Sequence, residues 1–335
     1  MEKLNLYSKD DILAYTSIRT GETKLGERVQ VISDLKLLPL SSCKFVLIGL
    51  PEDIGVKANY GITGTRTVWK DALSALLNIQ STKKFPGDEL AILGHLDFEQ
   101  KSAKAESLDP QNNDDLQYLR ELVSQIDDEV EALIKVVYGA GKIPIIIGGG
   151  HNNSYPILKA FSRSFNRPVN TINLDAHSDF RAMEGRHSGN GFRYAFEEKF
   201  LDKYALVGLH ENYNSQGIIE EFKSQPAHFH YVFFEDFIRA SKSYSQAFLE
   251  AMNFTEGLCG LEIDLDCIAG VLSSAMSPCG FSVQQVREMI GQTTIRQLFY
   301  LHIAEGASQL DNGKESNQTG KLIACLISDF IKAQK

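Results

Sequence analysis

Short apolar runs alternate along this chain with longer stretches in which apolar residues recur every three or four positions. The short runs are bounded by Gly, Pro or polar residues, which predicts buried β-strands. They fall at residues 44–49, 89–94, 143–147, 169–174, 204–209, 230–234, 260–266 and 297–303. The periodic stretches predict helices at residues 67–77, 116–138, 155–161, 282–290 and 321–332, with a further helix inside 237–252. Because buried strands alternate with helices, we expect an α/β protein with a three-layer αβα fold and a doubly wound, mostly parallel sheet.

The chain shows no break in composition that would mark a linker between domains. Residues 1–40 are mixed and polar, which predicts an N-terminal arm with short helical pieces. Residues 41–335 are expected to form a single α/β domain, because 335 residues with 43% hydrophobic content can bury one large core.

The net charge of the chain is −9 at pH 7. This charge argues against a surface for nucleic acid or anionic membranes, although a locally basic pocket could still bind a small anionic substrate. Five cysteines, odd in number, widely spread and without a Cys-x-x-Cys pair, indicate a reducing, intracellular setting. The polar N-terminus lacks the apolar core of a signal peptide, and no stretch approaches the ~20 apolar residues that span a bilayer. We therefore expect a soluble, cytoplasmic protein without nucleic-acid or membrane partners.

Six potential metal ligands lie at or just past the ends of three predicted strands. Their motifs are Gly-Gly-Gly-His after the run at 143–147, Asp-Ala-His-Ser-Asp after the run at 169–174, and Asp-Leu-Asp at the end of the run at 260–266. Strand ends are where α/β sheets build ligand sites, so we expect the six side chains to converge. They are His151, Asp175, His177, Asp179, Asp264 and Asp266.

Four carboxylates and two imidazoles in one place would repel one another and would be costly to remove from water. Two divalent cations about 3.5–4 Å apart, with a bridging hydroxide between them, would offset that cost. Mixed carboxylate and imidazole ligands suit Mn²⁺, and Co²⁺, Ni²⁺ and Zn²⁺ use the same ligand types.

Each of these motifs also has a plainer interpretation. Asp-Ala-His-Ser-Asp could be a solvated polar loop, and Asp264 and Asp266 could lie in water beyond the end of their strand. The glycines before His151 could bind phosphate, but no Gly-Lys-Ser or Gly-Lys-Thr sequence follows them.

Three further polar residues lie in or beside predicted strands. Glu262 could be a hydrogen-bond acceptor behind the ligands, but polar packing is the favoured interpretation. His302 lies outside the three motifs and is less informative. Glu305 follows the run at 297–303 and is either a plain surface residue or the group that binds a cationic substrate head.

In this order along the chain, the three motifs resemble those of the ureohydrolase family, which includes arginase, agmatinase and formimidoylglutamase. The resemblance runs from about Phe45 to the C-terminus and includes Gly-Val-Lys-Ala-Asn-Tyr-Gly at residues 55–61 and Ala-Glu-Gly around Glu305. It implies an α/β sheet fold, a binuclear Mn²⁺ centre, a homo-oligomer (trimer or hexamer) and the hydrolysis of guanidino or formimino carbon–nitrogen bonds.

The resemblance also implies roles for individual residues. Asp175 and Asp264 would bridge the two metals, and Asp179 would also hydrogen-bond the bridging hydroxide. Glu305 would receive the cationic amidine or guanidinium, so the expected catalytic residues are Asp179 and Glu305. The ligands of one metal would be His151, Asp175, Asp179 and Asp264, and those of the other would be Asp175, His177, Asp264 and Asp266.

Two positions favour one branch of this family. Arginases have Gly-Gly-Asp-His where this chain has Gly150 before His151, and they place a histidine where this chain has Phe192. Gly-Gly-Gly-His, Ser-Gly-x-x-Phe-Arg and Asp-Phe-Arg resemble formimidoylglutamase instead. Asn152 and Asn153 depart from the commoner acidic neighbour of the histidine.

The loop at residues 181–193, called the rim loop below, would supply the substrate-binding groups. Arginines bind carboxylates through two parallel hydrogen bonds, so an arginine-rich rim suits a molecule with two carboxylates. For any single arginine, however, a surface salt bridge is the better interpretation. The groups that this loop would offer to the substrate are Arg181, Arg186, His187, Ser188, Asn190 and Arg193.

We therefore expect an enzyme that cleaves the formimino carbon–nitrogen bond of N-formimidoyl-L-glutamate to give L-glutamate and formamide, a step of histidine degradation. The expected cofactors are two Mn²⁺ ions, and the expected partner is a small amidine or guanidino substrate. The alternatives are an arginase, an agmatinase or a guanidine hydrolase of the same family. A catalytically silent metal-binding or regulatory member is the alternative of another class, and the presence of all six ligands argues against it.

Overall fold

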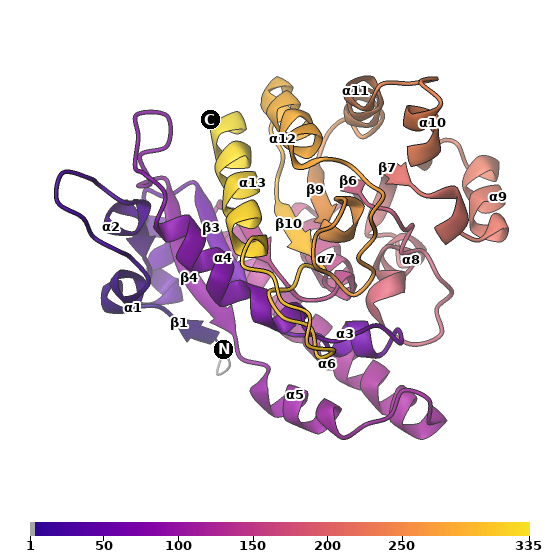
Figure 1. The fold of residues 1–335 in the computed structure, drawn as a ribbon, viewed down its shortest axis with the longest axis horizontal. Coiled ribbons are helices and arrows are strands. Elements are labelled where there is room, and N and C mark those ends of the chain that lie inside the picture. Colours follow the sequence, from indigo (N-terminus) through magenta and orange to yellow (C-terminus); the bar gives the residue numbers. More distant parts are fainter. Residues whose placement is uncertain (1–3) are drawn as a thin grey trace.

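The computed structural model describes residues 4–335 and places one sheet between two layers of helices (Figure 1). Within these residues, the strands are β1 (Leu4–Leu6), β2 (Gln30–Val31), β3 (Phe45–Gly49), β4 (Leu90–Leu96), β5 (Ile143–Ile147), β6 (Val169–Leu174), β7 (Leu201–Leu209), β8 (Phe229–Phe233), β9 (Cys259–Asp264) and β10 (Leu301–Ala304). The helices are α1 (Lys9–Ala14), α2 (Leu25–Arg28), α3 (Ile54–Lys57), α4 (Val68–Leu77), α5 (Glu99–Glu106), α6 (Asn113–Gly139), α7 (Ser154–Phe165), α8 (Gly191–Glu197), α9 (Gln216–Ser224), α10 (Phe234–Ile238), α11 (Tyr244–Phe254), α12 (Val283–Gln292) and α13 (Thr319–Ala333).

The strands form a single twisted sheet. Across residues 4–335 its order is β1-β4-β3-β5-β10-β9-β6-β7-β8, and β2 pairs with β4 beside this path. β1 and β4 are antiparallel, whereas the other pairs are parallel. The expected α/β architecture, with a mostly parallel sheet between helix layers, is confirmed.

Two hydrophobic cores fill the spaces between the sheet and the helices. Helices α4, α11, α12 and α13 cover one face, and α6, α7, α8 and α9 cover the other. Figure 1 shows α13 beside α4 in front of the sheet. Side chains alternate between the faces of a strand, so Phe45 and Leu47 of β3 face the first core, while Val46 and Ile48 face the second. Most of the short apolar runs are therefore strands that are buried on both faces, whereas β8 at the edge of the sheet is only partly buried.

The strand order brings four strand ends together. β5, β10, β9 and β6 are consecutive in the sheet, and the last residues of these parallel strands are in register or nearly so, as in the pairs Ile303–Ile147 and Ala304–Asp264. Parallel strands end at the same edge of a sheet. The segments that follow these four strands therefore meet at that edge, where α/β folds bind ligands.

The predicted strands correspond to β3–β10, and the predicted helices to α4, α6, α7, α11, α12 and α13, within a few residues at most ends. The last strand is shorter than predicted, because pairing with both β5 and β9 begins only at Leu301. Helices α5, α8 and α9 were not predicted. α5 is mostly polar and exposed and buries only Lys101 and Ala105, so it lacks the apolar periodicity on which the predictions rest.

The N-terminal segment attaches to one edge of the sheet. β1 and β2 both pair with β4, and α1 and α2 are the short helical pieces expected before residue 40. Residues 1–3 of the predicted arm lie outside the described residues. The division into an arm (residues 1–40) and one domain (residues 41–335) stays a prediction.

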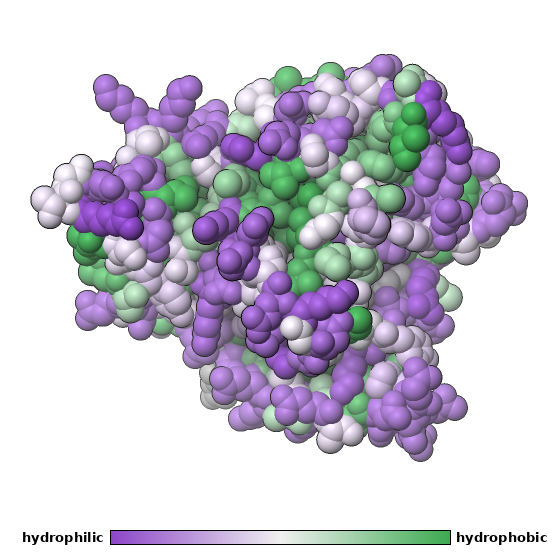
Figure 2. All heavy atoms as spheres, in the orientation of Figure 1, coloured by the Kyte–Doolittle hydropathy of each residue, from purple (hydrophilic) through white to green (hydrophobic). Residues whose placement is uncertain are grey.

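The surface of the front helix layer is mixed in character. Figure 2 shows polar side chains over most of the periphery of this face and apolar side chains near its centre, in the region of α12 and α13. Among the described residues, no helix combines the length and the apolar character that crossing a membrane requires.

Candidate metal centre

The structure brings together all six predicted ligands at the carboxyl edge of the central strands. The first follows β5 at the start of a short 3₁₀ turn, three lie on the loop after β6, and two come from the end of β9 and the turn that follows it. Because β5, β10, β9 and β6 are neighbours, loops far apart in sequence face one another here. The six residues are His151, Asp175, His177, Asp179, Asp264 and Asp266.

The ligand atoms form two clusters that share Asp175. In the first, Nδ1 of His151 lies 2.9 Å from Oδ2 of Asp179 and 3.3 Å from Oδ2 of both Asp175 and Asp264. In the second, Nδ1 of His177 lies 3.0 Å from Oδ2 of Asp266 and 3.7 Å from Oδ1 of Asp175. Within each cluster the ligand atoms lie within 4.8 Å of one another. The first cluster has the four members that the resemblance implies, and the second has three of its four, Asp264 being the exception.

The chain's own donors hold these carboxylates in place. The side-chain amide of Asn173 donates to Oδ2 of Asp175 at 2.8 Å, and the backbone N–H of His177 donates to Oδ1 at 2.7 Å. The backbone N–H of Asp266 donates to Oδ1 of Asp264 at 2.8 Å. Asp179 has a left-handed backbone with φ of 44°, which is uncommon for a residue other than glycine.

The chemistry of this donor set fits divalent cations. Neither ring nitrogen of His151, nor Oδ1 of Asp266, makes a hydrogen bond within the described residues, although all three atoms are buried. Buried polar atoms without a partner are rare in folded proteins. Imidazole nitrogens that face carboxylate oxygens across about 3 Å supply the ligand types that Mn²⁺ and related ions use.

The pKa values of the site show how strongly its charges interact. Burial lowers the pKa of His177, but the charges of Asp266 and Asp175 outweigh burial and raise it to about 12. Burial, reinforced by the charge of Asp175, raises the pKa of Asp179 to about 6. Without cations, protons on the imidazoles would therefore balance part of the negative charge.

Glu305 lies beside the ligands at the end of β10. Its Oε1 accepts a hydrogen bond from the backbone N–H of His151 at 2.8 Å, and its own N–H donates to the carbonyl of Gly149 at 3.1 Å. Its backbone is left-handed, with φ of 61°, which is uncommon for a residue other than glycine. Burial raises the pKa of this carboxyl to about 8. The structure therefore places Glu305 at the site rather than on the outer surface.

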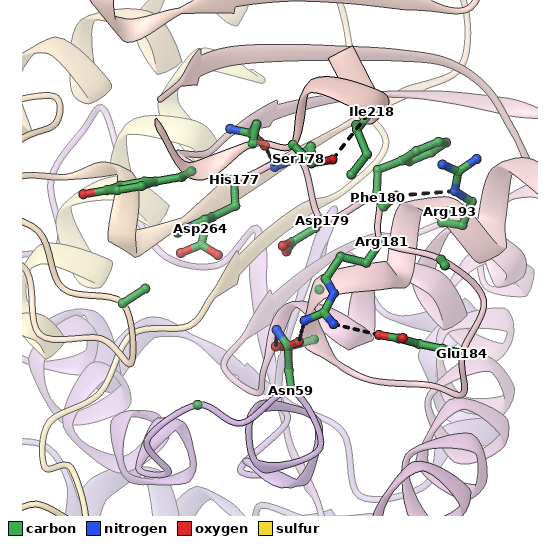
Figure 3. A pocket seen from close by; sticks show the side chains of 18 of the residues that line it. Asn59, His177, Ser178, Asp179, Phe180, Arg181, Glu184, Arg193, Ile218 and Asp264 are labelled. Carbon is green, nitrogen blue, oxygen red and sulfur yellow. Dashed lines mark hydrogen bonds and ion pairs between the residues drawn. The ribbon is translucent and has the colours of Figure 1, made fainter. Parts of the chain in front are cut away.

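A cavity of about 920 Å³ opens above the two clusters. Figure 3 shows His177, Asp179 and Asp264 grouped together and Arg181 extending toward Asn59 and Glu184, whereas Arg193 lies at the outer side of the cavity beside Phe180. Of the residues expected to contact substrate, four line this cavity: Arg181, Ser188, Arg193 and Glu305.

The other three residues that were expected at the rim lie behind the cavity wall. Arg186 is buried and donates to Oδ2 of Asp127 on α6 at 2.8 Å and to Oδ1 of Asn190 at 2.7 Å. Asn190 also accepts from the backbone N–H of His187 at 3.1 Å. Burial, reinforced by the charge of Arg181, lowers the pKa of His187 to about 3 and keeps this ring neutral. We expected Arg186, His187 and Asn190 to belong to an open rim. The structure instead places them beneath the rim loop, where they hold its shape.

The two asparagines after His151 have a partner on another loop. Glu52, fully buried after β3, accepts hydrogen bonds from the side-chain amides of Asn153 at 2.7 Å and Asn152 at 3.2 Å. Its Oε1 also accepts from the backbone N–H of Gly150 at 2.9 Å. An acidic residue at 152 or 153 would repel this carboxylate, which explains the departure from the commoner pattern.

Sequence reasoning undervalued Glu262 and His302. Both are fully buried, and Nδ1 of His302 lies 2.6 Å from Oε2 of Glu262. The same Oε2 lies 3.4 Å from Nε2 of His151, behind the ligand. The available signal was one ionisable residue in the middle of each of two apolar strands, because buried ionisable groups need partners.

Comparison with known proteins decides the family. The sequence model of the arginase family matches residues 43–332. The chain belongs to the arginase family. The expected resemblance to the ureohydrolases is therefore confirmed at the level of the family.

Solved arginase-family structures share the fold. The formiminoglutamase of Trypanosoma cruzi with Mn²⁺ superposes with a TM-score of 0.70 at 19% identity, over 93% of this chain and 98% of that one. The formimidoylglutamase of Bacillus subtilis superposes with a TM-score of 0.71 at 18% identity, over 95% of this chain and 93% of that one.

Curated relatives match over part of their length. A formimidoylglutamase of Macrococcus caseolyticus is 28% identical over 208 residues, which is 60% of this chain and 65% of that protein. A formimidoylglutamase of Streptococcus pyogenes is 27% identical over 198 residues, which is 55% of this chain and 52% of that protein. The match thus spans between about half and two thirds of these relatives.

Replacing Asp264 by Ala is expected to lower the number of Mn²⁺ ions bound per chain. The substitution removes a carboxylate from the first cluster and leaves His151 with fewer facing oxygens. Metal analysis of purified protein after dialysis would measure the loss, and Asp71→Ala, at an exposed position on α4, is the control. Parental metal content in the Asp264 variant would contradict the assignment.

Replacing Arg186 by Ala is expected to destabilise the fold by about 3–5 kcal/mol, because Asp127 would keep a buried charge without its partner. Arg181→Ala removes a half-exposed partner of Glu184 and is expected to cost less than about 1 kcal/mol. Urea unfolding followed by circular dichroism measures both values. Equal, small losses would mean that Arg186 does not hold the rim loop.

Proposed function

We propose that this chain is a hydrolase with a binuclear metal centre that cleaves the carbon–nitrogen bond of a linear amidine. The observation that carries the proposal is the pair of ligand clusters sharing Asp175 at the base of a cavity of about 920 Å³. Membership of the arginase family supports it. A trimeric or hexameric assembly and a cytoplasmic location stay predictions.

The proposed mechanism assigns a task to each side chain at the base of the cavity. Two Mn²⁺ ions, when bound by the six ligands, supply Lewis acidity that brings the pKa of a water close to neutrality. Glu305 receives the cationic amidine of the substrate. Asp179 accepts the proton of the attacking water and delivers it to the leaving nitrogen. The amidine carbon gains the oxygen, and the bond from that carbon to the leaving nitrogen breaks.

For the substrate, we infer N-formimidoyl-L-glutamate, with L-glutamate and formamide as products. The names of the curated relatives support this choice. Phe192 also supports it, since it packs edge-on against the ring of His151, with centroids 5.0 Å apart, and offers no imidazole to a substrate. Arg181 and Arg193 line the cavity and are the candidate partners of the two substrate carboxylates.

The charge pairing at the rim favours a second candidate, a guanidino compound without a second carboxylate. The guanidinium of Arg193 already binds both oxygens of Glu221, each at 2.5 Å. Arg181 donates to Glu184 at 2.8 Å. With Glu197 also in the lining, three glutamates offset the two arginines, so the rim is not the basic surface that the sequence suggested. Agmatine or guanidine would suit such a rim.

Substrate kinetics separate the two candidates. We expect formimidoylglutamate to give a higher kcat/KM than arginine, agmatine or guanidine, measured by release of formamide or urea. Arg193→Ala should lower that kcat/KM about ten- to hundred-fold, because a charge-assisted hydrogen bond contributes about 1.5–3 kcal/mol. The effect on substrates without carboxylates should be smaller.

Glu221→Gln is the matched variant for this experiment. It weakens the competing partner of Arg193 and leaves the arginine in place, so the KM for formimidoylglutamate should fall. A highest kcat/KM for agmatine or guanidine, with no response to either variant, would select the second candidate and leave the family assignment intact.

Mn²⁺ affinity is expected to rise with pH. In the metal-free protein the pKa of His177 is raised to about 12, so the imidazole is protonated at neutral pH and must lose its proton to bind a metal. Each displaced proton strengthens apparent binding by about tenfold per pH unit, and activity at limiting Mn²⁺ should fall on acidification. Calorimetric titrations in buffers of different ionisation enthalpy would count the released protons. An affinity independent of pH would exclude protonated imidazoles at the site.

A further inference from the structure

A buried glutamate–histidine pair lies directly behind the ring of His151. Oε2 of Glu262 lies 3.4 Å from Nε2 of His151 and 2.6 Å from Nδ1 of His302. The hydroxyl of Tyr300 donates to Oε1 of Glu262 at 2.8 Å, and Nε2 of His302 lies 3.3 Å from the carbonyl of Gly148. Both oxygens of Glu262 therefore have partners.

The sheet itself builds this arrangement. Glu262 on β9 is in register with His302 on β10, so the two side chains are direct neighbours across parallel strands. Tyr300, two residues before His302, contributes its ring to the core between the sheet and α6, α7 and α8. Side chains two apart on a strand share a face, so Glu262, His302 and Tyr300 lie together on this face. Ile263, the next residue of β9, belongs to the opposite core.

A cation between Glu262 and His302 does not fit the geometry. The separation of 2.6 Å between Nδ1 of His302 and Oε2 of Glu262 is that of a direct hydrogen bond. The three-residue group of His151, Glu262 and His302 is therefore an extension of the metal centre into the core, rather than a third ion site.

The two sides of the His151 ring face different partners. Nδ1 faces the carboxylates of Asp175, Asp179 and Asp264, whereas Nε2 lies 3.4 Å from Oε2 of Glu262. A carboxylate behind a ligating imidazole determines which ring nitrogen carries the hydrogen and how the ring is turned. With the hydrogen on Nε2, the lone pair of Nδ1 is directed at the first cluster.

On this basis, and given the proposed binuclear function, we propose that Glu262 is the positioning residue of His151. His302 and Tyr300 hold Glu262 from the other side. The pair determines the affinity of the metal position that His151 serves and has a smaller effect on the position served by His177, because His177 lies in the other cluster and the two clusters share only Asp175.

Titration of the metal-free protein with Mn²⁺ alone, by calorimetry, tests this role. Glu262→Gln keeps the shape of the side chain but has one acceptor oxygen where Glu262 uses two. One of the two binding steps should weaken by about 10–100-fold, while the affinity of the other changes much less. Glu131→Gln is the matched control, since Glu131 is a buried carboxylate on α6 that pairs with Lys159 and Arg163 away from the ligands.

Tyr300→Phe provides a second variant if Glu262→Gln does not fold. It removes the hydroxyl that donates to Oε1 of Glu262 and should weaken the same binding step to a smaller extent. Loss of thermal stability without any change in either binding step would overturn the positioning role, because simple polar packing predicts that result. An equal weakening of both steps would overturn it as well. A parent that binds no Mn²⁺ would instead overturn the proposed metal function, so the two failures are distinguishable.

Discussion

The structure depends on one electrostatic constraint: four carboxylates and two imidazoles share a small, mostly buried space at the base of the cavity. Such a group is stable only if fixed hydrogen-bond donors hold each carboxylate and cations or protons balance the total negative charge. The adjacency of β5, β10, β9 and β6 supplies the convergence. Asn173 and the backbone N–H groups of His177 and Asp266 supply the donors. The buried apolar strands around them keep the ligand-bearing loops in fixed positions.

The fold and the ligands were readable from the sequence because both depend on local patterns. A buried parallel strand is a short apolar run, and ligands at its end follow it directly, so His151 and Asp175 could be placed at one edge before the structure. The environment of Arg186 could not be placed in this way, since its partner Asp127 lies 59 positions away on α6. The same applies to the 38 positions between Tyr300 and Glu262. Pairing across a sheet depends on strand order, which the pattern of a single strand does not contain.

The charge of the cavity rim also depends on residues that are distant in the sequence. Counting arginines in residues 181–193 suggested a basic surface, yet Arg193 is bound by Glu221 from α9, a helix that was not predicted. Glu52 shows the opposite case, in which an unexplained sequence feature becomes clear. Asn152 and Asn153 make sense once a buried carboxylate from the loop after β3 is seen to lie between them. Local sequence identifies reactive groups, whereas neighbours from distant segments decide whether those groups are available.

Arg186 anchors the rim loop, so the side chains that support the loop differ from those that line the cavity. The loop is fastened beneath the cavity by Asp127, Asn190 and the rings of Tyr155 and Tyr194, which lie 4.7 and 4.8 Å from the guanidinium carbon. Its exposed side chains can therefore change without moving the strand ends that carry the ligands. A scaffold of this kind can acquire new selectivity through a few surface substitutions, while the inherited reaction centre stays intact. Sequence differences between relatives with this scaffold would appear first in the side chains that line the mouth of the cavity.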